Sequence, residues 1–286
     1  MENKLKPYIL LAPITIILIG IMGFGIANCI MQSLGYMPYI GEKNISFRFY
    51  KEIIGDSMFL ESLIFSLKTS FISSTVSVFI GVILAYFLSQ EKLSKIKESL
   101  LNLPVIIPHI VVVMLMITIF SQSGIISRIL YLLNIISDSS QFMSLVSDKN
   151  GVGVILVYLW KGIPFTIVTS YNILKNISNN LEKVALNLGA SKLQYFRYII
   201  LPLASPTIIS SFIILFAFSF GSFEVPFLIG PTTPKALSVS AYTSYISSNL
   251  SQRSYAMVIN VILSSLSFIL LIVYNKILGK INKYKI

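Results

Sequence analysis

Charged side chains are scarce in this chain. Asp, Glu, Lys and Arg make up only 12% of its 286 residues, whereas 55% are hydrophobic. An ordinary soluble domain holds about 25% charged residues. A soluble protein this apolar could not cover its surface with polar groups, so lipid must cover part of it. The composition predicts an integral membrane protein.

Cysteine and histidine are almost absent, and this excludes several kinds of site. The single cysteine, Cys29, excludes an intramolecular disulfide and a thiolate metal cluster. The single histidine, His109, excludes histidine-based metal sites and catalytic triads. The sequence also lacks the G-x-x-x-x-G-K-[ST] phosphate loop, so we expect no ATP hydrolysis by this chain. We expect neither an enzyme nor a chain that binds a cofactor or metal of its own.

Acidic residues are half as common as basic ones, 11 against 22. A basic excess can indicate nucleic-acid binding, but that function needs a basic face on a soluble fold. Here the basic residues lie between long apolar runs, where they orient a membrane protein. We expect contact with membrane lipid and none with nucleic acid.

Six apolar stretches are long enough to cross a bilayer as helices. The first is too long for the core of a signal peptide and no A-x-A cleavage site follows it, so we expect it to be retained. The sequence predicts an all-α membrane protein with six transmembrane helices, forming a single domain over residues 1–286. The predicted spans are 8–31, 69–89, 100–120, 152–174, 203–223 and 256–278.

The distribution of lysine and arginine predicts the orientation. With the N-terminus inside, thirteen basic residues fall in roughly fifty inner residues and seven in roughly ninety outer residues. The positive-inside rule then places both termini in the cytoplasm. The inner residues are Lys4, Lys6, Lys92, Lys95, Lys97, Lys175, Lys183, Lys192, Arg197, Lys276, Lys280, Lys283 and Lys285; the outer ones are Lys43, Arg48, Lys51, Arg128, Lys149, Lys235 and Arg253.

Two of the outer loops carry local signals. Apolar residues recur at helical spacing between Ile125 and Ile136, which predicts a short helix lying at the membrane interface. The third outer loop contains Pro226, Pro231 and Pro234, which we expect to break regular structure.

The inner loop over residues 175–202 is long and polar, but it has a pattern. Asn179 and Glu182 predict the start of a short helix, and Gly189 predicts its end. Ser191 and Gln194 form a second capping box that opens another helix. The first helix carries an apolar stripe, which can either dock into a partner or lie on the lipid surface. Its residues are Leu181, Val184, Ala185 and Leu188.

This loop resembles the EAA loop of binding-protein-dependent ABC transporter permeases, whose motif reads E-A-A-x3-G-x9-I-x-L-P. Five positions match at the correct spacing, while the first two motif positions are Lys183 and Val184, with Glu182 just before them. The six-span layout extends the likeness over nearly the whole chain. The matching residues are Ala185, Gly189, Ile199, Leu201 and Pro202.

The resemblance implies a type I importer permease, which forms half of a translocation pathway. In that family the loop inserts a coupling helix, here residues 181–189, into a cytoplasmic ATPase subunit that binds ATP. The implied partners are two such ATPase subunits, a second permease and an extracellular or periplasmic solute-binding protein. The departure at Lys183 leaves two interpretations open. In the first, Glu182 supplies the missing carboxylate; in the second, the chain forms a heterodimer with another permease that carries the fuller motif.

Inside the membrane, a few residues are candidates for the pathway. Pro164 frees backbone groups that need partners in the bundle interior. Lys161, beside Trp160, either snorkels outward or pairs with the nearest carboxylate, Glu224. His109 is expected to be an interior, hydrogen-bonded histidine.

The sequence leaves the driving force and the solute less defined. An ion-gradient-driven secondary transporter or a channel subunit is the alternative, but such proteins usually carry carboxylates inside the membrane. Here the acidic residues lie outside the spans or at their ends. The segment SFGSFEVPFLIG at 219–230 resembles the polyamine, ferric-iron and thiamine branch of the permeases. We expect a small polar or charged solute, with a polyamine favoured.

Single cysteines test the topology in a chain whose Cys29 is replaced by serine. A cysteine at Ser94 or Lys283 should stay unreactive when intact cells receive a membrane-impermeant thiol reagent, because both positions are predicted to be cytoplasmic. A cysteine at Ser139 should react. Labelling of the Ser94 position from outside would contradict the six-span orientation.

Overall fold

The computed structural model describes residues 6–90 and 94–283, and their regular structure is helical apart from one isolated bridge between Met37 and Glu42. Six helical segments are long and apolar enough to cross a membrane. The predicted all-α class with six spans is therefore confirmed. Of the basic residues used for the orientation, Lys4, Lys92 and Lys285 lie outside the described residues.

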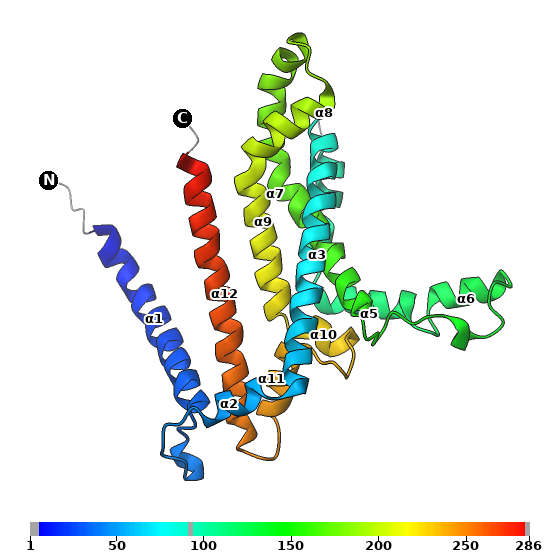
Figure 1. The fold of residues 1–286 in the computed structure, drawn as a ribbon. Coiled ribbons are helices and arrows are strands. Elements are labelled where there is room, and N and C mark those ends of the chain that lie inside the picture. Colours follow the sequence, from blue (N-terminus) through cyan, green and yellow to red (C-terminus); the bar gives the residue numbers. More distant parts are fainter. Residues whose placement is uncertain (1–5, 91–93, 284–286) are drawn as a thin grey trace. The chain divides into compact units, whose positions relative to one another are not determined.

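The spanning helices can be followed along the chain in Figure 1. Most of them extend past the predicted apolar cores, because a helix continues for as long as its backbone bonds are made, whether or not its residues are apolar. The long helices are α1 (Lys6–Ser33), α3 (Ser57–Ser89), α7 (Val152–Asn187), α9 (Leu201–Gly221) and α12 (Gln252–Lys283).

The third predicted span is not one continuous helix. Residues 95–120 form two shorter helices, α4 (Lys95–Ile106) and α5 (His109–Phe120), separated by Ile107 and Pro108. Proline lacks an N–H and restricts the residue before it to an extended conformation. Ile107 accordingly has φ −61° and ψ 130°, which ends α4.

The outer loops contain more helix than their composition suggests. The short helix predicted in the second outer loop is present as α6 (Ile125–Leu132), which projects away from the other helices of its unit (Figure 1). The third spanning segment, His109–Leu132, includes α6 and so begins and ends later than the predicted span 100–120. The third loop holds α10 (Glu224–Ile229) and α11 (Leu237–Tyr245), so the expectation that Pro226 breaks regular structure is wrong. Pro226 lies in the first turn of α10, where its missing N–H has no helical partner to lose.

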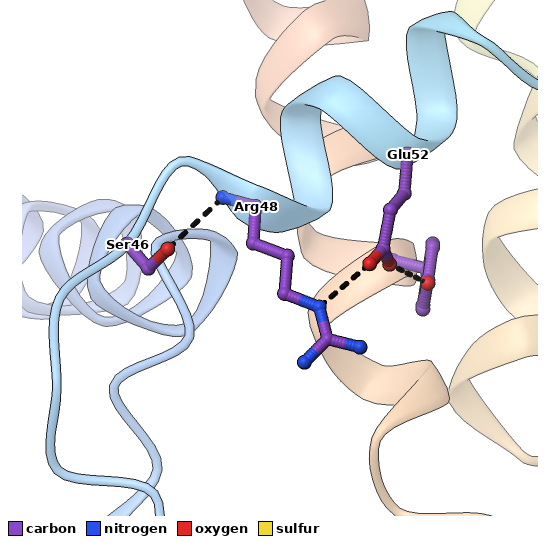
Figure 2. Close-up of polar contacts among 4 residues, drawn as sticks. Ser46, Arg48 and Glu52 are labelled. Carbon is purple, nitrogen blue, oxygen red and sulfur yellow. Dashed lines mark hydrogen bonds and ion pairs between the residues drawn. The ribbon is translucent and has the colours of Figure 1, made fainter.

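The chain divides into two compact units, Met1–Leu60 with Ser240–Ser265, and Glu61–Val239 with Leu266–Ile286. In the first unit, a polar cluster forms around the short helix α2 (Arg48–Ile54). The Arg48 guanidinium bonds the Glu52 carboxylate, and the Arg48 N–H donates to the Ser46 hydroxyl, as Figure 2 shows. Tyr255 also donates to Glu52. Arg48, followed by Tyr255, holds the pKa of Glu52 below its ordinary value.

In the second unit, α3 and α7 approach each other closely. A Cβ at Gly81 would lie 2.5 Å from the Thr166 Cβ, and one at Gly162 would lie 2.3 Å from the Ser77 Oγ. Real side-chain atoms do not approach this closely, so both positions require glycine at this helix spacing. Small residues at a helix interface allow backbones to pack closely inside a membrane.

The close contact between α3 and α7 should not tolerate a side chain at Gly81. We expect Gly81→Leu to lower the stability of the folded protein by about 1–3 kcal/mol or more, because the added atoms overpack the interface. Thermal unfolding of the purified protein measures the effect. Gly20→Leu is the matched control, since nothing lies within 4 Å of a Cβ at Gly20. An equal loss in both variants would contradict the assigned contact.

Candidate functional site

The first candidate site is the turn that ends α7. The helix stops at Asn187, and Gly189 adopts a left-handed conformation with φ +86°. The Ala190 N–H bonds the Ala185 carbonyl, and the Gly189 N–H bonds the Leu186 carbonyl, each at 3.0 Å. These two bonds form a Schellman motif, which closes a helix end around a left-handed residue. The turn predicted at Gly189 is confirmed.

The chain restarts at once in a second helix. The Ser191 hydroxyl accepts from the Gln194 N–H and the Gln194 side chain accepts from the Ser191 N–H, so the predicted capping box is present at the start of α8 (Lys192–Tyr195). A π-helical turn, Phe196–Ile200, then leads into α9. Pro202 explains this widened turn, because its ring clashes with a regular helix and its nitrogen cannot donate. We call residues 181–191 the cytoplasmic turn, after the side that the lysine and arginine distribution predicts for it.

The apolar stripe of the cytoplasmic turn does not lie on one surface. Ala185 is buried, with 6% of its surface exposed, in a cluster that includes Leu174, Tyr195 and Ile200. Leu188 and Val184 are 83% and 55% exposed. Of the four stripe residues, Ala185 therefore joins the turn to its own bundle, and the others form the outward apolar surface. That surface consists of Leu181, Val184 and Leu188.

The start of this segment differs from the prediction. A separate helix capped by Asn179 was expected, but α7 continues without interruption from Val152 to Asn187. The side chain of Asn179 lies outside the described residues. The reason is that helical propensity and backbone bonding carry a helix past a cap-like residue when no break is imposed. The segment is thus an extension of a spanning helix.

The remaining motif residues divide between the two sides of the turn. Lys183 is exposed, whereas Glu182 is partly buried. Ile199 packs against the cluster that contains Ala185, while Leu201 is partly buried and Pro202 is exposed. The motif residues Ala185 and Ile199 therefore pack in the protein's own cluster, whereas Lys183 is exposed.

The second candidate site is a small polar cavity inside the second unit. It has a volume of about 30 Å³ and lies between α3, α5, α7 and α9. Ser77, His109, Tyr158, Lys161 and Ser219 contribute its polar side chains together with two further serines, Ser73 and Ser74. The lining contains no acidic side chain.

Lys161 is held by the break between α4 and α5. Its ammonium donates to the Ile107 carbonyl at 2.7 Å and lies 3.5 Å from the His109 Nδ1. An ammonium can only donate, so a hydrogen bond here requires an Nδ1 that carries no proton. The ring of His109 stacks on Phe218 with centroids 4.9 Å apart.

The pair expected between Lys161 and Glu224 is not formed. No ion pair within 4 Å joins Lys161 and Glu224, both of which the structure describes, and Glu224 is exposed at the start of α10. The Ile107 carbonyl accepts from Lys161 in place of a carboxylate. This carbonyl has no helical partner because α4 ends just before Pro108. Trp160 is partly exposed and Pro164 lies within α7; neither lines the cavity.

The sequence analysis missed the hydroxyl residues of α3. They are buried along one face of the helix, and the Ser66 hydroxyl accepts a bond from the Leu237 N–H at 2.7 Å. The spacing of three and four residues was a readable signal for one helix face. The residues are Ser62, Ser66, Thr69, Ser70, Ser73, Ser74 and Ser77.

Comparison with known proteins assigns the chain to a family. The family model described as "Binding-protein-dependent transport system inner membrane component" matches residues 77–281. The chain belongs to this family. It is a multi-pass membrane protein and a permease subunit of an ATP-binding-cassette importer, and it is not itself an enzyme, since ATP hydrolysis belongs to separate ATPase subunits.

The permease resembles proteins with different solutes. It is 28% identical over 205 residues to the molybdate/tungstate transport system permease protein WtpB of Pyrococcus abyssi, covering 70% of this chain and 73% of that protein. It is 25% identical over 236 residues to a probable sulfate transport system permease protein of Helicosporidium sp., covering 81% and 83%. Its fold resembles a bacterial alginate importer, with a TM-score of 0.76, 18% identity, and coverage of 94% and 93%.

A double-mutant cycle tests the assignment of Lys161 to the Ile107 carbonyl. Lys161→Met should lower stability by about 1–3 kcal/mol, because it leaves the partly buried Ile107 carbonyl without its donor. Glu224→Gln should be nearly neutral, and the two effects should add within about 0.5 kcal/mol in thermal or denaturant unfolding. A coupling energy above about 1 kcal/mol would instead show that Lys161 and Glu224 form an ion pair.

Proposed function

We propose that the permease forms half of the translocation pathway of an ATP-driven importer and couples to a separate ATPase through the cytoplasmic turn. The observation that carries the proposal is the exposed apolar surface of Leu181, Val184 and Leu188 beside the left-handed Gly189. This surface lies at the end of a spanning helix and is too short to be a further span. A partner that buries it would remove apolar area from water.

The packing of Ala185 supports transmission of force through this turn. Ala185 contacts a cluster that includes Leu174 on α7, Ile200 in the π-helical turn and Ala204 on α9. A displacement of the turn must therefore move the cytoplasmic ends of α7 and α9, because a close-packed cluster does not deform freely. The same two helices line the polar cavity.

The proposed assembly contains two cytoplasmic ATPase subunits, a second permease and an extracellular or periplasmic solute-binding protein, in a bacterial cytoplasmic membrane. The family description supports this arrangement, because it names transport that depends on a binding protein. Both termini are proposed to be cytoplasmic, and the two compact units to act as one permease domain over residues 1–286. The second permease is either another copy of this chain or a different chain.

For the solute, we propose a small oxyanion. Support comes from the molybdate/tungstate and sulfate permeases among the relatives, and from the lysine in the polar cavity. The polyamine expected from residues 219–230 is not matched by the relatives named above. A polycation would also meet the like charge of Lys161 in the cavity.

Leu188→Asp tests the coupling proposal. Leu188 is 83% exposed, so the change should leave insertion and folding intact. It should abolish ATP-dependent uptake and co-purification of the ATPase, because it places a charge in an apolar contact. Met143→Asp is the matched control, since Met143 is exposed on the second outer loop. Retained ATPase binding in Leu188→Asp would contradict the proposal.

Ala185→Asp should behave differently from Leu188→Asp. Ala185 is buried in the protein's own cluster, and a carboxylate there has no partner. We expect loss of folded permease in detergent, in addition to loss of uptake, as measured by size-exclusion chromatography. A well-folded Ala185→Asp variant that merely loses the ATPase would show that Ala185 faces the partner after all.

A further inference from the structure

The polar cavity between α3, α5, α7 and α9 is lined by hydroxyl groups and by the ammonium of Lys161. Ser73 and Ser74, on α3, each donate to the Ser70 carbonyl, at 3.1 Å and 2.7 Å. This backbone bond is the usual way in which a helix satisfies a buried serine. Ser77 lies one turn further along the same face, is 1% exposed and lines the cavity.

A hydroxyl that lines a cavity can donate a hydrogen bond to a ligand there. The Ser77 hydroxyl lines the cavity, and so does the ammonium of Lys161. That ammonium has three N–H donors, of which one is used by the Ile107 carbonyl and a second is directed to His109. One ammonium N–H and one hydroxyl are therefore available to a ligand in the cavity.

The chemistry of the lining selects the charge of that ligand. The available groups are a cation and hydroxyls, and the lining holds no carboxylate that could balance the Lys161 charge or bind a cation. An anion supplies the missing counter-charge in a partly buried site. The volume of about 30 Å³ admits one or two water-sized species, so a whole oxyanion does not fit in this conformation.

Gly162 keeps the two donors within reach of one ligand. It neighbours Lys161 on α7 and faces Ser77 across the helix contact, where a Cβ would lie 2.3 Å from the Ser77 Oγ. Any side chain at residue 162 would displace the hydroxyl from the cavity. The close packing of α3 and α7 thus also builds the site.

We propose that this cavity is an anion-binding site on the translocation path, where a halide-sized ion or one oxygen of an oxyanion is held between the Lys161 ammonium and the Ser77 hydroxyl. The position on the path rests on the proposed function as a permease. The anion comes from one of two sources: the transported solute or chloride from the medium. The shared chemistry is a small inorganic anion.

Anion-dependent stability tests the site without transport. The purified transporter is unfolded thermally while sodium chloride replaces sodium gluconate at constant ionic strength, because gluconate is too large for the cavity. The wild type should gain roughly 2–4 °C in a saturable manner. Lys161→Met should lose this gain, and Ser77→Ala should shift its midpoint to higher chloride. The proposal is overturned if chloride does not raise the unfolding temperature of the wild type, or if it raises that of Lys161→Met by the same amount.

Lys175→Met is the matched control for these variants. Lys175 lies on the same helix, with its ammonium 5.2 Å from the Tyr171 ring, outside the cavity. This variant should keep the full chloride response. Loss of the response in Lys175→Met would attribute it to general surface charge and would overturn the proposal.

Competition and uptake identify the source of the anion. Two results together would assign the site to the solute. Sulfate or molybdate abolishes the chloride response, and ATP-dependent uptake of the oxyanion falls at least tenfold in Lys161→Met but is retained in Lys161→Arg. A chloride response without such competition would assign it to a resident halide. ATP-dependent uptake of spermidine by the wild type, with no chloride response, would overturn the anion site and leave the importer function standing.

Discussion

The close contact between α3 and α7 is the constraint on which the second unit depends. Gly81 and Gly162 leave no room for a side chain, and this brings the hydroxyl face of α3 against α7. The contact helps to place Lys161 and closes the polar cavity on one side, while α7 continues beyond it to Asn187. In a membrane, helices gain little from burying apolar side chains, so packing of small residues has to provide this contact.

Proline produces the second recurring constraint. Pro108 breaks the third span and frees the Ile107 carbonyl for Lys161. Pro202 widens the helix before α9 into a π-helical turn, and the neighbouring Ile200 packs with Ala185. In both places the missing N–H of proline leaves the backbone irregular, and an irregular backbone in a membrane persists only where protein groups satisfy it. The irregular positions therefore coincide with the two candidate sites.

Much of the architecture could be predicted from the sequence, because long apolar runs and local caps are one-dimensional signals. The six spans, the helix at 125–132, the left-handed Gly189 and the Ser191–Gln194 box all depend on residues within a few positions of each other. The inward orientation of Ala185 could not be predicted, because the stripe of an amphipathic helix does not say which of its residues meets its own bundle. The partner of Lys161 was missed for a similar reason. A backbone carbonyl has no signature in a sequence, so the sequence predicted either snorkelling or a pair with a carboxylate.

The exposed apolar turn at Leu188 also has a consequence for how the cell makes this protein. If the proposed coupling holds, the newly inserted chain displays an 83%-exposed leucine and a half-exposed valine to the cytosol before its ATPase is present. Such a patch is a recognition signal for chaperones and membrane proteases. Matched synthesis of the two subunits would shelter it, while an excess of the membrane subunit would be degraded as an orphan. The abundance of the transporter is then set by whichever subunit is made in the smaller amount.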